Sequence, residues 1–183
     1  TNTGSAASYD FQIDHLLIQQ AVQKALRALD TFRQEEGNGI KEDLRKRVHT
    51  IETIMTQLEP HENERINQKK NRLKARFEEL APAIQTDRNR FEEELIFYLE
   101  KLDISEEKQR LGSHSAYFNQ CIEEQEYTGR KLSFISQEMG REINTIGSKA
   151  NHAEMQKMVV LMKDELEKIK EQLAGMNILV ESW

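Results

Sequence analysis

The chain has 183 residues, a formal net charge of −6, 32% charged residues and 37% apolar residues. This length allows one or two modest domains and excludes a large enzyme core. The apolar fraction excludes wholesale disorder, and the net negative charge argues against a protein that coats nucleic acid nonspecifically. The single cysteine, Cys121, cannot form an internal disulfide, which favours a reducing cytoplasm, and the apolar runs are too short for a membrane span.

The N-terminal part of the chain is predicted to be a long helical arm. Residues 1–9 are small and polar and are interpreted as a linker or an expression scar, so the arm is placed at 10–86. From about Asp10, apolar residues recur every three or four positions in two rows, which predicts a helix buried against two partners. The Gly37-Asn38-Gly39 stretch is interpreted as the end of this helix and the turn of an antiparallel hairpin.

A basic segment follows Pro60, which either kinks the return helix or begins a new one. The basic side chains of this segment are Arg65, Lys69, Lys70, Arg72, Lys74 and Arg76. The same segment, from His61 to Arg76, contains only two acidic residues, Glu62 and Glu64. We interpret the segment as a solvated helix face, with phosphate binding as the alternative.

The C-terminal part, 87–183, is predicted to be a compact helical bundle. The Thr86-Asp87 pair is expected to cap a helix, and further helices are expected at about 105–123, 128–146 and 148–177. The last of these carries a heptad seam, formed by Met155, Val159, Met162, Leu166, Ile169, Leu173 and Met176. Such a seam fits packing within the chain or against a partner helix equally well. Because nothing has the pattern of a β-strand, the predicted fold is all-α, a long antiparallel helical hairpin or arm followed by a compact bundle.

Two carboxylates, Glu138 and Glu142, lie one helical turn apart at the border of the apolar face of the 128–146 helix. Their mutual repulsion must be offset. Salt bridges from nearby basic residues would do so and are the more common arrangement. A hard divalent cation shared by the two carboxylates is the alternative.

His114 lies on or near the apolar face of the 105–123 helix. A histidine in that position is more often a hydrogen-bonded core residue than a metal ligand or a base. Glu106, Glu107 and Arg110 precede it closely, so a polar cluster at the start of this helix is the alternative. Neither a Gly-rich phosphate loop nor a nucleophile elbow nor a zinc motif accompanies these residues.

Three stretches of the chain resemble the YicC family of bacterial proteins. The block GRKLSFISQEMGREINTIGSKANHAEM is similar to the family pattern GRKLDFLxQEMNRExNTIGSKxND. Upstream, DISEEKQRLGSHSAYF and ALRALDTFRQEEGNGIKEDL resemble two further family patterns. The likeness runs from about His15 to Leu173.

This resemblance implies a divalent-metal-dependent endoribonuclease of the bacterial cytoplasm that cuts single-stranded or small RNA. It also implies a homo-oligomer, a hexamer in the intact protein. Carried onto this chain, the catalytic residues are His114, Glu138 and Glu142, and the Mn²⁺ or Mg²⁺ ligands are Glu107, Glu138 and Glu142. The residues expected to bind RNA and its phosphates are Arg110, Arg130, Gln137, Arg141, Asn144 and Lys149.

The chain departs from the family pattern at Ser133, Gly140 and His152, where the family carries an acidic residue, Asn and Asp. Two carboxylates are lost, which weakens the expectation of a metal site. The family's N-terminal part, with its Met-Thr-Gly-like opening, is not recognised, so the chain is interpreted as a fragment that could be inactive alone. The alternative function is a non-catalytic helical module that assembles with itself or binds RNA or a partner.

Overall fold

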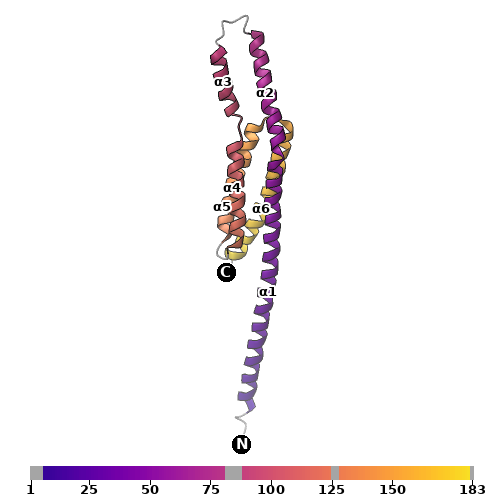
Figure 1. Cartoon of the computed structure of the whole chain (residues 1–183). Coiled ribbons are helices and arrows are strands. Elements are labelled where there is room, and N and C mark those ends of the chain that lie inside the picture. Colours follow the sequence, from indigo (N-terminus) through magenta and orange to yellow (C-terminus); the bar gives the residue numbers. More distant parts are fainter. Residues whose placement is uncertain (1–5, 81–87, 125–127, 182–183) are drawn as a thin grey trace. The chain divides into compact units, whose positions relative to one another are not determined.

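The computed structural model describes residues 6–80, 88–124 and 128–181, and the side-chain environments of 15–79, 88–124 and 129–175. The helices are α1 (Ala6–Thr56), α2 (Leu58–Leu80), α3 (Arg88–Glu100), α4 (Ser105–Glu123), α5 (Thr128–Ala150) and α6 (Ala153–Glu181) (Figure 1). The described residues contain no strand, which confirms the all-α class. None of the helices described is long and apolar enough to cross a membrane.

The turn predicted at Gly37–Gly39 is wrong, because α1 continues through it as one helix. Neither glycine has the positive φ of a helix-ending cap. Glycine inside a helix costs about 1 kcal/mol relative to alanine. The flanking residues are good helix formers, and each added residue contributes a further backbone hydrogen bond, so two glycines do not stop the helix. The Thr86-Asp87 cap expected before α3 lies outside the described residues.

The chain divides into two compact units, Thr1–Asp43 and Leu44–Trp183. In the first unit every described side chain from 15 to 36 is exposed. The apolar side chains among them are Leu16, Leu17, Ile18, Val22, Leu26, Leu29 and Phe32, each 46% to 63% exposed. We call these seven residues the α1 apolar row. The sequence predicted that this helix is buried against two partners, but within the first unit its apolar side chains are exposed.

The second unit has a core built from the apolar stripes of several helices. The end of α1 contributes Leu44, Val48 and Ile51 at the predicted spacing. The heptad seam of α6 is also buried, with its described members from Met155 to Leu173 at most 2% exposed. Its side chains are used inside the chain, where α6 packs along α5.

Pro60 lies in the first turn of α2, where proline is tolerated, so it marks a new helix. Helices α2 and α3 pack together, with Phe77 and Phe91 stacked at 3.9 Å between ring centroids. Arg65 of α2 is only 2% exposed. It is therefore part of the interior, which corrects the solvated-face interpretation at this position, whereas Arg72, Lys74 and Arg76 are exposed as expected.

The end of α5 falls later than predicted, at Ala150 rather than near residue 146. Gly147 does not stop the helix but lets α6 approach, since a Cβ there would lie 3.0 Å from Val159 Cγ1. The break comes at Asn151, whose φ of 35° is the left-handed conformation that ends many helices. His152 follows at the start of α6.

Candidate functional site

The candidate site is the seam between α4 and α5. These helices pack against each other. They are antiparallel, because Lys149 near the end of α5 bonds to Glu107 near the start of α4, while Lys131 near the start of α5 bonds to Glu124 just beyond α4. The helical period turns a row of polar side chains from each helix toward this seam, at the border of the apolar core.

Glu107 anchors one end of the seam. It is 6% exposed, and its Oε1 accepts a hydrogen bond from Lys149 Nζ at 2.8 Å. Lys149 Nζ also donates to the carbonyl of Asp103 at 2.9 Å. The Ser105 hydroxyl and amide donate to Asp103, which lowers the pKa of that carboxyl and secures the start of α4. Lys149 thus holds a buried carboxylate and the α3–α4 connection together.

His114 lies two turns beyond Glu107 on α4, and Glu142 lies two turns before Lys149 on α5, about 10 Å along each axis. Because Glu107 and Lys149 are paired, this register places His114 and Glu142 at the same level of the seam. His114 is half-buried and Glu142 is only 9% exposed. The sequence-predicted histidine and one of the predicted carboxylates are thereby brought to the same part of the seam.

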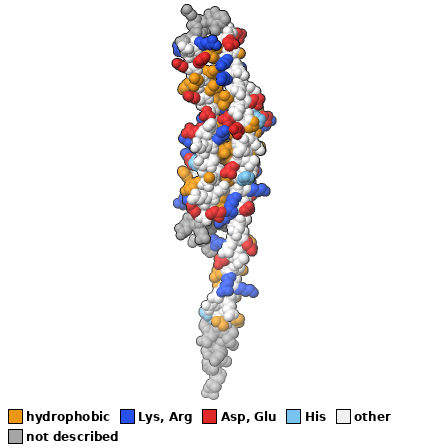
Figure 2. Space-filling view, in the orientation of Figure 1, with side chains coloured by type: hydrophobic (Ala, Val, Ile, Leu, Met, Phe, Trp, Pro, Cys, Tyr) orange, Lys and Arg blue, Asp and Glu red, His pale blue; other side chains and the backbone are white. Residues whose placement is uncertain are grey.

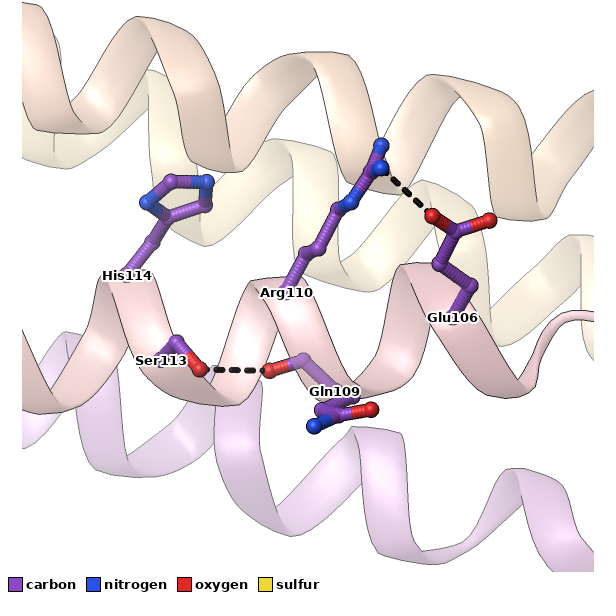
Figure 3. Close-up of a pocket in the computed structure, with 5 residues that line it drawn as sticks. All are labelled: Glu106, Gln109, Arg110, Ser113 and His114. Atoms are coloured by element: carbon purple, nitrogen blue, oxygen red, sulfur yellow. Dashed lines mark hydrogen bonds and ion pairs between the residues drawn. The ribbon is translucent and has the colours of Figure 1, made fainter.

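A pocket of about 280 Å³ opens on α4 beside His114 and is lined by Glu106, Gln109, Arg110, Ser113 and His114. Figure 3 shows the His114, Arg110 and Glu106 side chains pointing from α4 toward the ribbon of α5. Arg110 pairs with Glu106 across one helical turn. The pocket therefore combines an imidazole with a guanidinium, the two groups that proton transfer and phosphate binding require.

The two predicted carboxylates of α5 differ in their surroundings. Glu138 pairs with Arg141, 3.2 Å away and one turn along the helix. Glu142 has no hydrogen bond or ion pair to any described residue, although it is nine-tenths buried. Its carboxylate oxygens are not among the fully buried atoms that lack a partner, so they still reach solvent. The charge of Glu138 is thus offset by a salt bridge, as one of the two sequence interpretations expected, whereas Glu142 has no such partner among the described residues.

Glu107 does not join this pair. Its level on the seam is about 10 Å from that of Glu142, and Lys149 already neutralises it. Within the described part of the chain, Glu107, Glu138 and Glu142 do not bring three ligand oxygens within 4.8 Å of one another.

The other predicted RNA-binding residues of α5 line its outer face. Arg130, Gln137, Arg141 and Asn144 are all exposed. On the side of the molecule drawn in Figure 2, basic and acidic side chains are interspersed along the described helices of the second unit. A ligand held here would meet separate cationic side chains beside the seam.

The sequence over residues 58–178 matches the C-terminal part of the YicC-like endoribonuclease family. The match covers more than half of the chain. The chain belongs to the YicC-like family.

Curated relatives agree with this assignment. The chain is 36% identical over 163 residues to a probable endoribonuclease YicC of Clostridioides difficile (strain 630), covering 88% of this chain and 55% of that protein. It is 28% identical over 146 residues to a probable endoribonuclease YicC of Haemophilus influenzae (strain ATCC 51907 / DSM 11121 / KW20 / Rd), covering 80% and 50%. The chain therefore spans about half the length of the curated relatives it matches.

The three residues that differ from the YicC pattern, Ser133, Gly140 and His152, lie in different structural environments. At Gly140 a Cβ would lie 3.2 Å from Leu166 Cδ2, so glycine suits the close packing of α5 on α6. Ser133 is half-buried, and its carbonyl accepts a hydrogen bond from the Ser136 hydroxyl. His152 stacks obliquely on His61 of α2, with 5.6 Å between ring centroids.

Sequence reasoning missed the polar residues that place α2 against this YicC-like bundle. Arg65 donates to the carbonyls of Lys149, Ala150 and Leu102, and Glu62 pairs with Lys108 at 2.6 Å. A signal was present, because Leu58, Glu62 and Arg65 lie at i, i+4 and i+7 and so share the buried face of α2. The charges of Glu62 and Arg65 concealed that stripe.

Proposed function

We propose that the protein is an endoribonuclease that cuts single-stranded RNA in the bacterial cytoplasm, with the α4–α5 seam as its cleavage site. The proposal is supported by family membership and by the names of the two relatives. The observation that carries the location is the shared level of half-buried His114 and buried Glu142, next to the pocket that Arg110 lines. Surface charge pairs alone do not require such a buried carboxylate.

A divalent cation, Mn²⁺ or Mg²⁺, fits the pair Glu138 and Glu142 better than it fits Glu107. Glu142 is buried without a cationic partner among the described residues, and Glu138 lies one turn away with 20% of its side chain exposed. Two carboxylates at this spacing offer the oxygen ligands that hard cations prefer. When bound, such a cation activates water or stabilises the departing oxygen.

The residues of the chain then have separate tasks. His114 accepts or donates a proton at the ribose 2′-hydroxyl or at the leaving oxygen, because imidazole serves as both base and acid near neutral pH. Arg110, Arg130 and Arg141 hold phosphates through charge-assisted hydrogen bonds. Gln137 and Asn144 bond to bases or sugars from the outer face of α5.

Arg110 and Arg141 pair with glutamates of their own helices, whereas Lys149 is held by partners outside its own helix. Its ammonium group already binds Glu107 and the Asp103 carbonyl. In the proposed site it positions α4 against α5, and it reaches phosphate only if RNA displaces one of these partners.

The test is cleavage of an end-labelled single-stranded RNA by the full-length protein with Mn²⁺, with Mg²⁺ and with EDTA. Glu142→Gln keeps the size of the side chain but removes its charge, and we expect a rate at least about 100-fold lower. His114→Gln is expected to lower the rate about 100-fold as well. Glu167→Gln, on the exposed face of α6, and His49→Gln, exposed on α1, are the matched controls and should cut normally.

The outcomes separate the two functions under consideration. Cutting that survives EDTA and Glu142→Gln would remove the metal role, and normal cutting by His114→Gln would move the site elsewhere. RNA binding without cutting under any condition would favour the non-catalytic module, for which the exposed α1 apolar row is the specific support.

A further inference from the structure

A second cluster of ligating side chains lies at the junction of α2 with the α5–α6 turn, away from the α4–α5 seam. His61 and Glu64 of α2 and His152 at the start of α6 each offer a ligand atom within 4.8 Å of the other two. It is the one such three-residue group within the described residues. Both histidines are half-buried and Glu64 is exposed, so the cluster is open to solvent on one side.

The fold holds these side chains together through its backbone. His61 and Glu64 are three residues apart and share a face of α2. Asn151, with its φ of 35°, reverses the chain between α5 and α6 and places His152 beside them. Arg65, one turn beyond His61, fastens α2 to the last carbonyls of α5. The relative positions of the three groups are thus set by buried contacts.

The chemistry of the cluster indicates what it binds. Two imidazoles and one carboxylate form a ligand set typical of zinc sites with an open position and of other transition metals, whereas Mg²⁺ prefers oxygen ligands alone. Ligand atoms around a tetrahedral Zn²⁺ are about 3.4 Å apart at the usual bond lengths of about 2.1 Å. The observed separations therefore need side-chain movements of only about 1 Å.

Two further observations point to a cation. His152 Nδ1 is buried and has no hydrogen-bond partner in the described structure, which costs about 1–3 kcal/mol if left uncompensated. Gln68 Nε2 donates to Glu64 Oε1 at 2.9 Å, which orients this carboxylate and leaves its second oxygen for a ligand.

We propose that His61, Glu64 and His152 bind one divalent transition-metal ion of the zinc class, which ties α2 to the α5–α6 turn. The site is separate from the carboxylate pair Glu138 and Glu142 and does not depend on the proposed ribonuclease activity. Since the ion joins groups from separate helices, it stabilises the folded second unit when bound.

The experiment measures Zn²⁺ bound to the tag-free protein by equilibrium dialysis with elemental analysis, and the midpoint of thermal unfolding with and without Zn²⁺. We expect one ion per chain and a higher midpoint with Zn²⁺. His61→Gln and His152→Gln should each weaken binding by at least about 100-fold and abolish the rise. Mg²⁺ at the same concentration should not displace the bound Zn²⁺, and it should produce no rise in the midpoint that depends on His61 or His152.

The matched controls are His49→Gln, an exposed histidine of α1, and Glu142→Gln, in the α4–α5 seam. Both should bind Zn²⁺ as the unaltered protein does, so loss of the ribonuclease carboxylate leaves this result unchanged. Circular dichroism checks that each variant is folded, and Glu64→Gln provides a third ligand substitution on the exposed side. Zn²⁺ binding that is absent from the unaltered protein, or unchanged in both histidine variants, would overturn the proposal.

Discussion

Arg65 shows how a single charged residue can organise the interior of this protein. The last carbonyls of a helix have no partner within the helix, and those of Lys149 and Ala150 accept hydrogen bonds from Arg65. A third bond, at 2.7 Å, reaches the carbonyl of Leu102 between α3 and α4. Burial lowers the pKa of Arg65, and the charges of Glu62 and Asp103 act in the opposite direction. The guanidinium stays protonated because its normal pKa is so high.

We predict that Arg65→Met destabilises the second unit by about 3–5 kcal/mol, because three carbonyls, one of them fully buried, lose their donor and Glu62 loses a neighbouring charge. Arg65→Lys should be more stable than Arg65→Met but less stable than the unaltered protein, because an ammonium group lacks the planar set of donors of a guanidinium. Urea denaturation followed by circular dichroism measures both effects. Arg72→Met, exposed on the same helix, should change stability by less than about 0.5 kcal/mol. Equal stability of the two methionine variants would contradict this role for Arg65.

At the scale of the helices, Gly37 and Gly147 differ in the space that is available for a side chain. Gly37 lies inside α1 with nothing within 4 Å of the position a Cβ would take. Gly147 lies in α5 where a Cβ would be 3.0 Å from Val159 Cγ1 of α6. Helix α1 therefore has room for a larger residue at position 37, whereas Gly147 allows α5 and α6 to approach closely.

Gly37→Ala and Gly147→Ala should therefore change stability in opposite directions. Gly37→Ala should stabilise α1 by about 1 kcal/mol through helix propensity, visible as higher helicity and a higher unfolding midpoint. Gly147→Ala should destabilise the second unit by about 1–3 kcal/mol through overpacking.

Combining Gly147→Ala with Val159→Ala tests the cause of the second effect. The double variant should lose less stability than the sum of the two single variants, because shortening Val159 makes room for the new methyl group. Additive losses would show that the contact with Val159 is not responsible.

At the scale of the whole molecule, the two units use their apolar residues differently. The second unit buries its apolar stripes in one core, including the α6 seam. In the first unit, the α1 apolar row stays exposed. Five of its members, Ile18, Val22, Leu26, Leu29 and Phe32, lie on one side of α1 by the helical period, and an exposed apolar side of this kind is typical of a surface that packs against another helix. Such a surface would serve the homo-oligomer that the resemblance to the YicC family implies.

We predict that adding two charges to this row lowers the oligomer mass. Val22→Glu with Leu29→Glu places both carboxylates on one face of α1, where burying them against a partner is costly. Light scattering coupled to size-exclusion chromatography measures the mass. The control, Gln19→Glu with Gln23→Glu, adds the same charge at exposed polar positions and should leave the mass unchanged. If the two double variants have the same mass, the row is not the interface.

The candidate site was only partly predictable. The residues of the α4–α5 seam could be named because they stand in a motif and on a helical period. Their pairing could not, since the contact of Glu107 with Lys149, 42 positions later in the chain, depends on how two helices pack. The same holds for the cluster in which His61 and Glu64 of α2 meet His152 of the α5–α6 turn, because His152 lies far from the other two in the sequence.

Helical period and family motif, both readable from sequence alone, determined the all-α class and the buried faces of α4, α5 and α6. Local patterns of this kind repeat every three to four residues, so they need no knowledge of distant contacts. Tertiary structure decided that α1 continues through Gly37–Gly39, that Arg65 is buried, and that Glu107 pairs with Lys149 away from Glu142. These outcomes depend on packing between helices, where burial and partner distance outweigh the local preference of any residue.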